Sequence, residues 1–232
     1  MSLLTPETLA AAIDQTLLRP TVSLREGEQW LAGQRECGFA AVCVPPALAD
    51  LAVAAMRGSG TAVCSVVGFP LGYDVTAAKA FEAAWLVTLG CREIDVVVRV
   101  GDLMAGDDET VRADIAAVVD AVRSASGATA PGLVKVILET AYLDASAIIS
   151  GCRLAEEAGA DFVKTSTGFG PRGASVADVR AMRAAVGDRL GVKAAGGIRT
   201  LADAVAMIDA GATRIGTSAG REILAEIADR EV

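Results

Sequence analysis

Short runs of β-branched residues alternate with helix-like segments along the whole chain, and this alternation limits the possible folds more than any other feature. Eight runs have the length and composition of buried strands: residues 11–16, 40–44, 61–67, 93–98, 133–139, 161–166, 191–195 and 213–216. Eight strands with intervening helices in 232 residues predict an α/β fold, the (β/α)₈ TIM barrel. A doubly wound open sheet is the alternative, although such sheets usually have about five or six strands.

The segments between these runs carry helix signals. Apolar side chains recur at helical spacing in three sets: Phe81, Trp85 and Leu89; Val111, Ile115, Val118 and Val122; and Leu201, Val205 and Ile208. Three pairs have the spacing of a capping box: Ser23 with Glu26, Ser175 with Asp178, and Thr200 with Asp203. Gly159 and Gly211 stand just before strands, where a left-handed glycine ends a helix. No Pro/Ser-rich linker divides the chain, so we expect a single domain of residues 1–232.

The composition narrows the functional classes. A net charge of −8 argues against a nucleic-acid partner, because phosphate backbones are bound by a basic stripe. No apolar run approaches the ~20 residues of a membrane span, and residues 1–6 lack the basic segment of a signal peptide. The five scattered cysteines are typical of reduced thiols in a cytoplasmic protein. The absence of histidine excludes Ser-His-Asp and Cys-His nucleophiles and histidine-ligated zinc.

Lysine is rare in this chain and stands where an amine has chemistry to do. Only 4 of the 21 basic residues are lysine. Lys164 ends an apolar run and opens into Thr165, and Lys193 lies in the strand before Gly196. Arginine stays protonated in proteins, whereas a buried lysine can lose its proton and attack a carbonyl group. The pattern therefore indicates an imine-forming enzyme.

Strand alternation brings an acid toward both lysines. On the fourth strand Ile94, Val96 and Val98 form an apolar set that fits packing against helices, which turns Asp95 into the barrel. Two ammonium groups close together disfavour each other's charge, so one lysine is expected to have a lowered pKa. The carboxylate can accept or relay a proton. The alternative interpretation is that the three side chains form structural ion pairs in a barrel core.

Other polar residues have weaker assignments. Lys135 is expected at the N-terminal end of the barrel in a structural ion pair, and Lys79, on a helix, in solvent. Cys43 is a candidate for the site, with a small core position as the favoured interpretation. Asp14 is a candidate anchor for Lys193, and Glu139 is a second candidate acid without an assigned role.

Glycine-rich segments follow the last two strands, at residues 196–200 and 216–220. Backbone N–H groups at helix starts bind phosphate well, and barrels commonly bind it at this place. The alternative is that these glycines only permit tight turns. Residues 168–173 match the G-x-G-x-x-G dinucleotide fingerprint, but they lie in the sixth unit and no acidic residue ends the next strand. We expect this loop to fold over a substrate instead.

At these residues the chain resembles the deoxyribose-phosphate aldolases, a family of class I aldolases with a (β/α)₈ barrel. The matching motifs run nearly end to end: residues 13–18, 41–45, 67–72, 93–97, 162–170 and 192–200. The resemblance implies that Lys164 forms a Schiff base, that Lys193 tunes its pKa and assists proton transfer, and that Asp95 relays protons through water. The implied reaction is the reversible cleavage of 2-deoxy-D-ribose 5-phosphate to acetaldehyde and D-glyceraldehyde 3-phosphate in deoxynucleoside catabolism, without a metal or organic cofactor.

The resemblance also implies a phosphate site and an assembly. The phosphate site maps onto Gly168, Gly196, Gly197, Gly216 and Ser218, with Arg199 as a further candidate. Asp14, Thr16, Cys43 and Thr165 are candidate supporting residues. Relatives are commonly dimers, so a homodimer or another homo-oligomer is expected.

The chain departs from the family pattern at two positions, and other functions remain open. Many relatives have histidine where Gln15 stands, and some have a lysine near Phe169, whose absence leaves phosphate to backbone amides. The competing enzyme is another lysine-dependent, phosphate-binding barrel, such as a different class I aldolase or a thiazole-synthase-like protein. The competing non-enzyme is a barrel that serves as a binding or scaffold protein.

Overall fold

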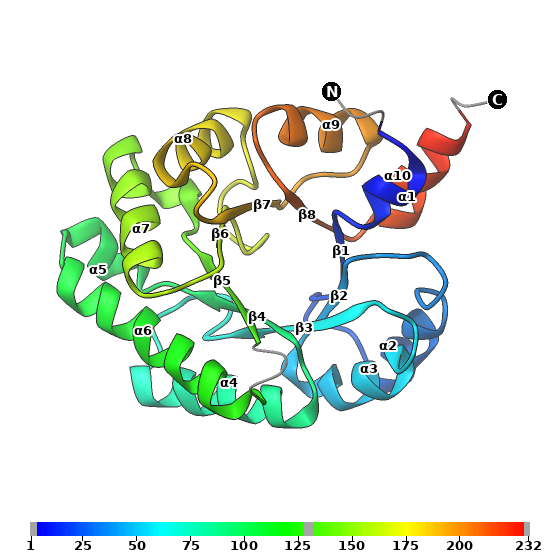
Figure 1. Cartoon of the computed structure of the whole chain (residues 1–232), viewed down its shortest axis with the longest axis horizontal. Helices are drawn as coiled ribbons and strands as arrows, with labels where there is room; N and C mark the ends of the chain where they lie inside the picture. The colour runs from blue at the N-terminus through cyan, green and yellow to red at the C-terminus, as the bar shows by residue number, and fades with distance from the viewer. Residues whose placement is uncertain (1–3, 128–131, 230–232) are drawn as a thin grey trace.

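The chain forms a closed barrel of eight parallel strands, in which β8 pairs with β1. A computed structural model describes residues 4–127 and 132–229; the remainder of the predicted 1–232 domain lies outside the described residues. The strands are β1 (Ile13–Thr16), β2 (Ala41–Val44), β3 (Ala62–Val67), β4 (Glu93–Val97), β5 (Leu133–Ile137), β6 (Phe162–Lys164), β7 (Gly191–Ala195) and β8 (Arg214–Thr217). The view down the barrel shows helices around the outside (Figure 1). The TIM-barrel prediction is confirmed, and β8–β1 closure excludes the open sheet.

The helices begin and end largely where the sequence signals place them. They are α1 (Pro6–Ala10), α2 (Leu24–Ala32), α3 (Ala49–Met56), α4 (Thr76–Leu89), α5 (Val100–Ala105), α6 (Asp108–Ala125), α7 (Ala145–Glu157), α8 (Val176–Val186), α9 (Leu201–Asp209) and α10 (Gly220–Ala228), with 3₁₀ turns at Pro46–Leu48 and Thr140–Tyr142. Ser23 and Thr200 form full capping boxes, and the Ser175 side chain accepts from the Asp178 amide. Gly159 and Gly211 have φ values of 81° and 111°, as a left-handed helix end requires.

The two faces of each strand meet different surroundings. Outward residues such as Ile94, Val96 and Val98 join the large apolar core between the barrel and its helices. Inside the barrel, one small apolar cluster contains Ala41, Cys43, Cys64 and Val66. Much of the remaining interior is polar and buried, since Asp14, Glu93, Asp95, Lys135 and Lys193 are all at most 5% exposed. Isolated charges are costly to bury, so these groups must pair with one another.

Helix α4 corrects one prediction. Lys79 was expected in solvent, but it is buried and its Nζ lies 2.7 Å from Asp114 Oδ2 of α6. Lys79 also donates to the carbonyl oxygen of Val97 at the end of β4, at 3.0 Å. The acceptors that face α4 therefore turn this lysine inward. The apolar spacing of Phe81 and Trp85 predicted the helix correctly, but both side chains point to solvent.

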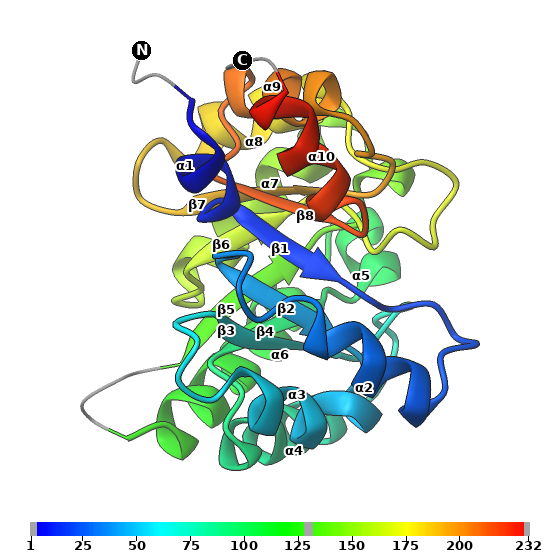
Figure 2. The ribbon, with the colours of Figure 1, turned by 90° about the vertical axis from the view of Figure 1, so that its right-hand side faces the viewer.

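Parallel strands place all the loops that follow them at one end of the barrel. The arrowhead of β1 points toward this end, on the right in Figure 2. Residues at these carboxyl ends are the ones that barrel enzymes use for chemistry. Within the described residues, no helix is long and apolar enough to span a membrane.

Candidate active site

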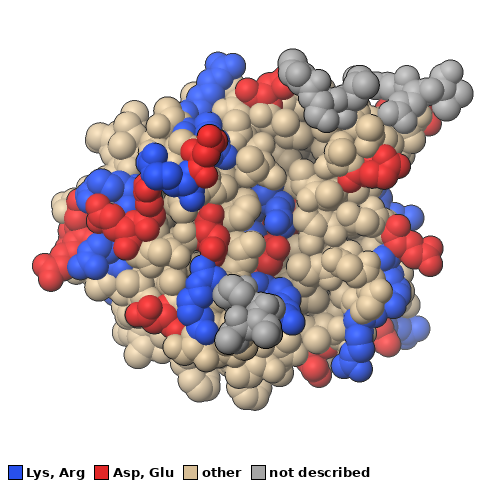
Figure 3. Space-filling view, in the orientation of Figure 1, with Lys and Arg blue, Asp and Glu red and all other residues tan. Residues whose placement is uncertain are grey.

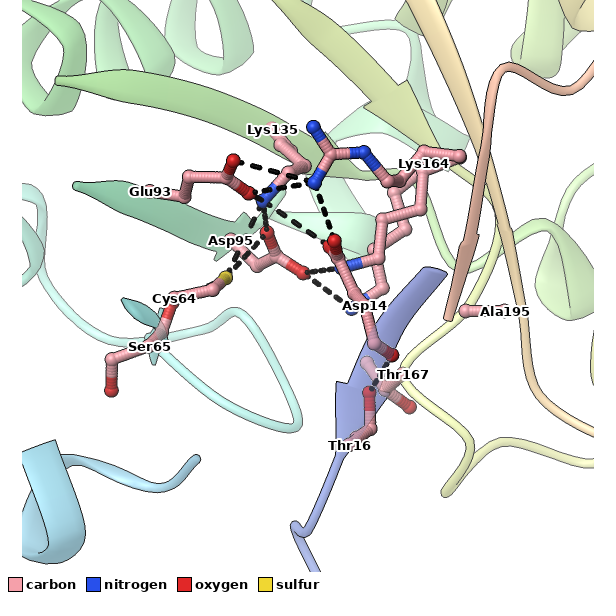
Figure 4. A network of polar contacts seen from close by, with 12 residues as sticks. Asp14, Thr16, Cys64, Ser65, Glu93, Asp95, Lys135, Lys164, Thr167 and Ala195 are labelled. Atoms are coloured by element: carbon pink, nitrogen blue, oxygen red, sulfur yellow. Dashed lines mark hydrogen bonds and ion pairs between the residues drawn. The ribbon is translucent and has the colours of Figure 1, made fainter. Parts of the chain in front are cut away.

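Asp95 lies at the centre of a buried network inside the barrel. Its Oδ2 atom accepts from the Nζ atoms of Lys164 and Lys193, each at 2.7 Å. The two lysines are register partners on β6 and β7, which brings their amines to one point. Figure 4 shows Asp95 among these contacts in the barrel interior. The predicted convergence of Asp95, Lys164 and Lys193 is therefore present in the structure.

The second oxygen of Asp95 faces the opposite direction. Asp95 Oδ1 lies 2.8 Å from Lys135 Nζ and 3.2 Å from Cys64 Sγ. Lys135 also pairs with Glu93 at 2.6 Å and Asp14 at 3.5 Å. The prediction that Lys135 forms ion pairs is confirmed, but its placement apart from the site was wrong. Lys135 is the middle residue of β5, in register with Asp95, so its amine reaches the same carboxylate.

Asp14 joins the network from β1. Its carboxylate pairs with Lys193 and with Arg214 of β8. Arg214 continues to Glu93 at 3.2 Å and lies 5.5 Å from the ring centroid of Phe162. The predicted contact between Asp14 and Lys193 is thus present. Sequence reasoning missed Arg214. Arg214 lies two residues before Gly216 in β8, so strand alternation places both residues on the inward face of that strand.

The charges of this network do not balance when every group is ionised. It contains three carboxylates, Asp14, Glu93 and Asp95, and four cationic side chains, Lys135, Lys164, Lys193 and Arg214. Full ionisation would leave one net positive charge, four minus three, in a buried space. Loss of one proton from an amine removes this excess.

The protonation of three of these groups is fixed by their partners. Burial alone would lower the pKa of Lys193, but the Asp14 and Asp95 carboxylates raise it above its ordinary value. Lys135 has a pKa raised by Asp95 and the other acids around it, also against the effect of burial. Burial likewise opposes ionisation of Asp95, yet the surrounding lysines hold its pKa well below the usual range. The predicted pKa lowering in one lysine therefore does not fall on Lys193.

A cavity of about 670 Å³ opens above this network, at the carboxyl ends of the strands. Of the four cationic groups in the network, only Lys164 lines it. The predicted residues Thr16, Gly168, Gly196, Gly197, Arg199, Gly216 and Ser218 also line it. Sequence reasoning did not select eight further lining residues, Leu17, Leu18, Arg19, Trp30, Thr167, Ala195, Ile198 and Thr217. All of them except Trp30 lie within or next to a quoted segment, but a motif does not say which of its residues face a cavity.

The remaining candidates have supporting positions. Cys43 is fully buried in the apolar cluster inside the barrel, the favoured one of its two interpretations. Thr165 is buried and its hydroxyl links β6 to Ala195, accepting from that residue's amide at 3.1 Å. Gln15 Oε1 accepts from the Gly220 amide at 2.9 Å, and its Nε2 donates to the Ser218 carbonyl at 3.4 Å. Gln15 therefore holds the loop that follows β8.

Two glycines of the predicted phosphate loops have steric reasons to be glycine. Gly196 has a φ of 88°, and a Cβ there would lie 2.9 Å from the Cα of Gly173. A Cβ on Gly216 would lie 3.1 Å from the Cε of Lys193. The tight-turn interpretation thus holds at Gly196, and Gly216 leaves room for the lysine side chain. Both residues still line the cavity, so the structural and the binding roles are compatible.

The donor set in the barrel interior does not fit a metal ion. Cys43, Cys64 and Asp95 place possible ligand atoms within 4.8 Å of one another. However, Lys135 Nζ contacts both Asp95 Oδ1 and, at 3.4 Å, Cys64 Sγ. An ammonium group already occupies the position where a cation would compensate these ligands, and its charge would repel a second cation.

Comparison with known proteins agrees with this geometry. Residues 8–226 match the family model described as DeoC/LacD family aldolase. The chain belongs to the DeoC/LacD aldolase family. It is 49% identical over 218 residues to the deoxyribose-phosphate aldolase of Thermoanaerobacter sp. strain X514, covering 94% of this chain and 96% of the relative. It is 52% identical to that of Mycolicibacterium paratuberculosis, covering 93% and 95% of the two chains.

Solved structures of aldolases share the fold of this DeoC/LacD family member. A deoxyribose-phosphate aldolase from Aeropyrum pernix, described as having a unique tetrameric structure, has a TM-score of 0.88 at 32% identity and covers 97% of this chain and 93% of its own. The aldolase QR15 also has a TM-score of 0.88, at 37% identity, with 96% and 97% of the two chains covered.

Proposed function

We propose that this DeoC/LacD aldolase reversibly cleaves 2-deoxy-D-ribose 5-phosphate to acetaldehyde and D-glyceraldehyde 3-phosphate through a Schiff base on Lys164. One observation carries the proposal: Lys164 reaches both the cavity and Asp95, while Lys193 contacts the same carboxylate oxygen from the adjacent strand. The homologous deoxyribose-phosphate aldolases support the choice of sugar.

Position and charge favour Lys164 over Lys193 as the nucleophile. Lys193 is completely buried and pairs with both Asp14 and Asp95, which retain its proton. Lys164 pairs with Asp95 and lines the cavity. When Lys164 releases a proton, the three carboxylates of the network balance the three remaining cations. The neutral amine then has the lone pair that attack on an aldehyde requires.

The reaction uses this amine as an electron sink. Lys164 Nζ adds to C1 of the open-chain sugar, and loss of water gives a protonated imine. A base removes the proton of the C3 hydroxyl, the C2–C3 bond breaks, and its electron pair moves to the imine to give an enamine and D-glyceraldehyde 3-phosphate. Protonation at C2 and hydrolysis release acetaldehyde and restore the amine. Asp95, acting through water, is the proposed base, and Lys193, through the carboxylate that it shares with Lys164, is proposed to tune the Lys164 amine and to assist proton transfer.

The cavity suits a phosphorylated substrate. Glycine-rich loops after β7 and β8 bring Gly196, Gly197 and Ser218 to its wall, where backbone amides can donate to a phosphate group. Arg199 on the same wall supplies a positive charge. Because Phe169 cannot donate from its side chain, we propose that amides and Arg199 carry most of the phosphate binding.

The chain is further proposed to act as a single-domain enzyme in the cytoplasm, as a homodimer or another homo-oligomer. The tetrameric description of the Aeropyrum pernix relative supports an oligomer. We propose no nucleic-acid partner, since the net charge is −8 and acidic and basic side chains are interspersed on the face that Figure 3 presents.

Product identification tests the proposed reaction. Purified protein in EDTA-containing buffer should convert 2-deoxyribose 5-phosphate into equal amounts of acetaldehyde and D-glyceraldehyde 3-phosphate. Cleavage of a different sugar phosphate alone would favour another lysine-dependent aldolase. Folded protein that cleaves no sugar phosphate would favour a binding protein.

A further inference from the structure

Two loops at the mouth of the barrel are tied together behind the cavity wall. The segment after β5 (Leu133–Ile137) contains Glu139, and the segment after β6 carries Thr167, Gly168 and Phe169, all three of which line the cavity. The amide of Thr140 donates to the carbonyl oxygen of Thr165 at 2.9 Å, which fixes the start of both segments. The cavity wall formed by residues 167–169 therefore depends on the segment behind it.

Glu139 is the unusual residue of this tie. It is 3% exposed and has a φ of 55°, the only positive φ of a non-glycine residue within residues 4–127 and 132–229. A left-handed backbone is unfavourable for a residue with a Cβ and persists where surrounding contacts hold it. Its Oε1 atom is buried and has no hydrogen-bond partner among the described residues. A strained, buried carboxyl group at the edge of a cavity needs a compensating role.

The other oxygen of Glu139 holds the cavity wall. Glu139 Oε2 accepts from the Thr167 amide at 3.2 Å and also from the Thr167 hydroxyl. The same hydroxyl oxygen accepts from the Phe169 amide at 3.0 Å. One carboxyl oxygen thus sets the position of Thr167 directly and of Phe169 through one intermediate.

The wall also makes an aromatic contact with another loop, and the Glu139 carboxyl group lies close to Gly170. The ring of Phe169 packs edge-on against Phe69 of the loop after β3, with centroids 5.5 Å apart. A Cβ on Gly170 would come within 3.0 Å of the Glu139 carboxyl carbon. Residues 167–169 are therefore fixed between the Glu139 carboxyl group and an aromatic contact.

We propose that Glu139 is a positioning residue: the Thr167 and Phe169 amides are held in internal hydrogen bonds, and this orders the Gly168 amide between them for binding of the substrate phosphate. This inference rests on the proposed function. With phenylalanine at position 169, binding at this wall depends on the Gly168 backbone, which binds well only if it is ordered before the substrate arrives. Glu139 acts through Thr167 and does not touch the reacting atoms.

The test compares three proteins: wild type, Glu139→Gly and Glu139→Gln. Glycine accepts the left-handed backbone without strain but removes the acceptor, whereas glutamine keeps one acceptor oxygen. For Glu139→Gly we expect KM for 2-deoxyribose 5-phosphate to rise roughly tenfold or more, with kcat changed less than about threefold. The kcat/KM for unphosphorylated 2-deoxyribose should stay within about threefold of wild type. Glu139→Gln should recover most of the lost affinity.

Hydrogen–deuterium exchange supplies a readout that does not depend on activity. The amides of Thr167 and Phe169 should exchange roughly tenfold faster in Glu139→Gly than in wild type. Glu157→Gln, on the exposed surface of α7, is the matched carboxylate control and should change neither exchange nor KM. Unchanged exchange and KM in Glu139→Gly would overturn the inference, as would equal losses of kcat/KM for the two sugars.

Two further arms keep the inference testable if the first variant or the proposed function fails. If Glu139→Gly does not fold, the variant Thr167→Val is used in its place, and Thr167→Ser is its control. Thr167→Val should raise KM for the phosphorylated sugar, whereas Thr167→Ser should not. Equal KM values for the two variants would overturn the inference. If the wild-type protein cleaves neither sugar, the proposed function fails, and the affinity for inorganic phosphate then tests the role of Glu139. Roughly tenfold weaker phosphate binding by Glu139→Gly than by wild type supports ordering by Glu139. Equal phosphate binding by the two proteins refutes it.

Discussion

The molecule buries lysine beside aspartate in two places, and the two places differ in charge balance. Outside the barrel, Lys79 and Asp114 form a one-to-one pair between α4 and α6, completed by the Val97 carbonyl and the Thr76 hydroxyl. Inside the barrel, Asp95 alone contacts three lysine amines. The exterior pair is neutral and satisfied, whereas the interior network has one cation more than it has anions.

In the proposed function, this difference in charge balance separates a structural ion pair from a reactive one. In the exterior pair burial lowers the pKa of Lys79, but its amine is held by Asp114 and the Val97 carbonyl oxygen, and the pair carries no excess charge. The interior network lies directly beneath a cavity, and release of one proton from it both removes the excess charge and creates a nucleophile. Burial of lysine alone is therefore a weak sign of function; burial with too few carboxylates is a stronger one.

The largest expected loss of activity comes from a substitution in the interior network. Lys164→Ala removes the proposed nucleophile, so kcat for 2-deoxyribose 5-phosphate should fall by about 10⁵-fold. The barrel should stay folded, because Asp95 keeps Lys135 and Lys193 as partners. Steady-state kinetics with a thermal melt of the same sample measures both. Activity within tenfold of wild type would place the nucleophile elsewhere.

Lys193→Leu should have the next largest effect. The variant loses one positive charge beside Lys164 and a lysine amine that contacts the same Asp95 oxygen. We expect kcat for 2-deoxyribose 5-phosphate to fall by about 10³-fold while the barrel stays folded, measured by steady-state kinetics with a thermal melt of the same sample. Activity within tenfold of wild type would remove Lys193 from the proposed mechanism.

The exterior pair should give the opposite result. Asp114→Asn leaves Lys79 buried without its counter-charge and should lower the free energy of unfolding by about 3 kcal/mol. Activity of the remaining folded enzyme should change less than about threefold. The double variant Lys79→Met/Asp114→Leu should regain most of the stability, because an apolar pair of similar volume replaces the ions. A hundredfold loss of kcat in folded Asp114→Asn would make the exterior pair part of the catalytic machinery.

The smallest effect concerns acid stability. The Asp14 and Asp95 carboxyl groups have lowered pKa values in the fold, so they bind fewer protons there than in the unfolded chain. Their stabilisation is present above an ordinary carboxyl pKa of about 4 and is lost as the pH falls further, by up to about 1.4 kcal/mol per pH unit for each of the two groups. Melting curves between pH 2 and pH 5 should show this slope in wild type and in the exterior double variant. In Asp95→Asn, stability should fall less steeply with decreasing pH than in wild type. An unchanged slope would mean that Asp95 does not contribute to the pH dependence of stability.

The sequence predicted the fold and the convergence of Asp95, Lys164 and Lys193 because both follow from local patterns. Strand alternation is enough to turn Asp95, Lys164 and Lys193 inward, and eight strands in series are enough to suggest closure. The pattern overestimated strand length most at residues 161–166, of which only Phe162–Lys164 form a strand. It was also two residues too long at 133–139, where Glu139 has a left-handed backbone.

The errors arose where the partner is distant in the sequence. Lys79 was misplaced because its acceptors, Asp114 and Val97, lie 35 and 18 residues away. Lys135 was separated from Asp95 because register between β4 and β5 is a property of the closed barrel and cannot be read from either strand alone. Arg214 and Cys64 were missed for the same reason, as both contacts exist only once the barrel has formed.

The most direct test of the central claim is chemical trapping of the imine. The protein is incubated with 2-deoxyribose 5-phosphate and sodium borohydride, and intact mass is followed by peptide mapping, with Lys193→Leu and Lys79→Met as comparison variants. The account predicts one substrate-derived adduct per chain, on Lys164, in wild type and in Lys79→Met. An adduct on Lys193, or a folded wild-type protein with no adduct, would contradict it.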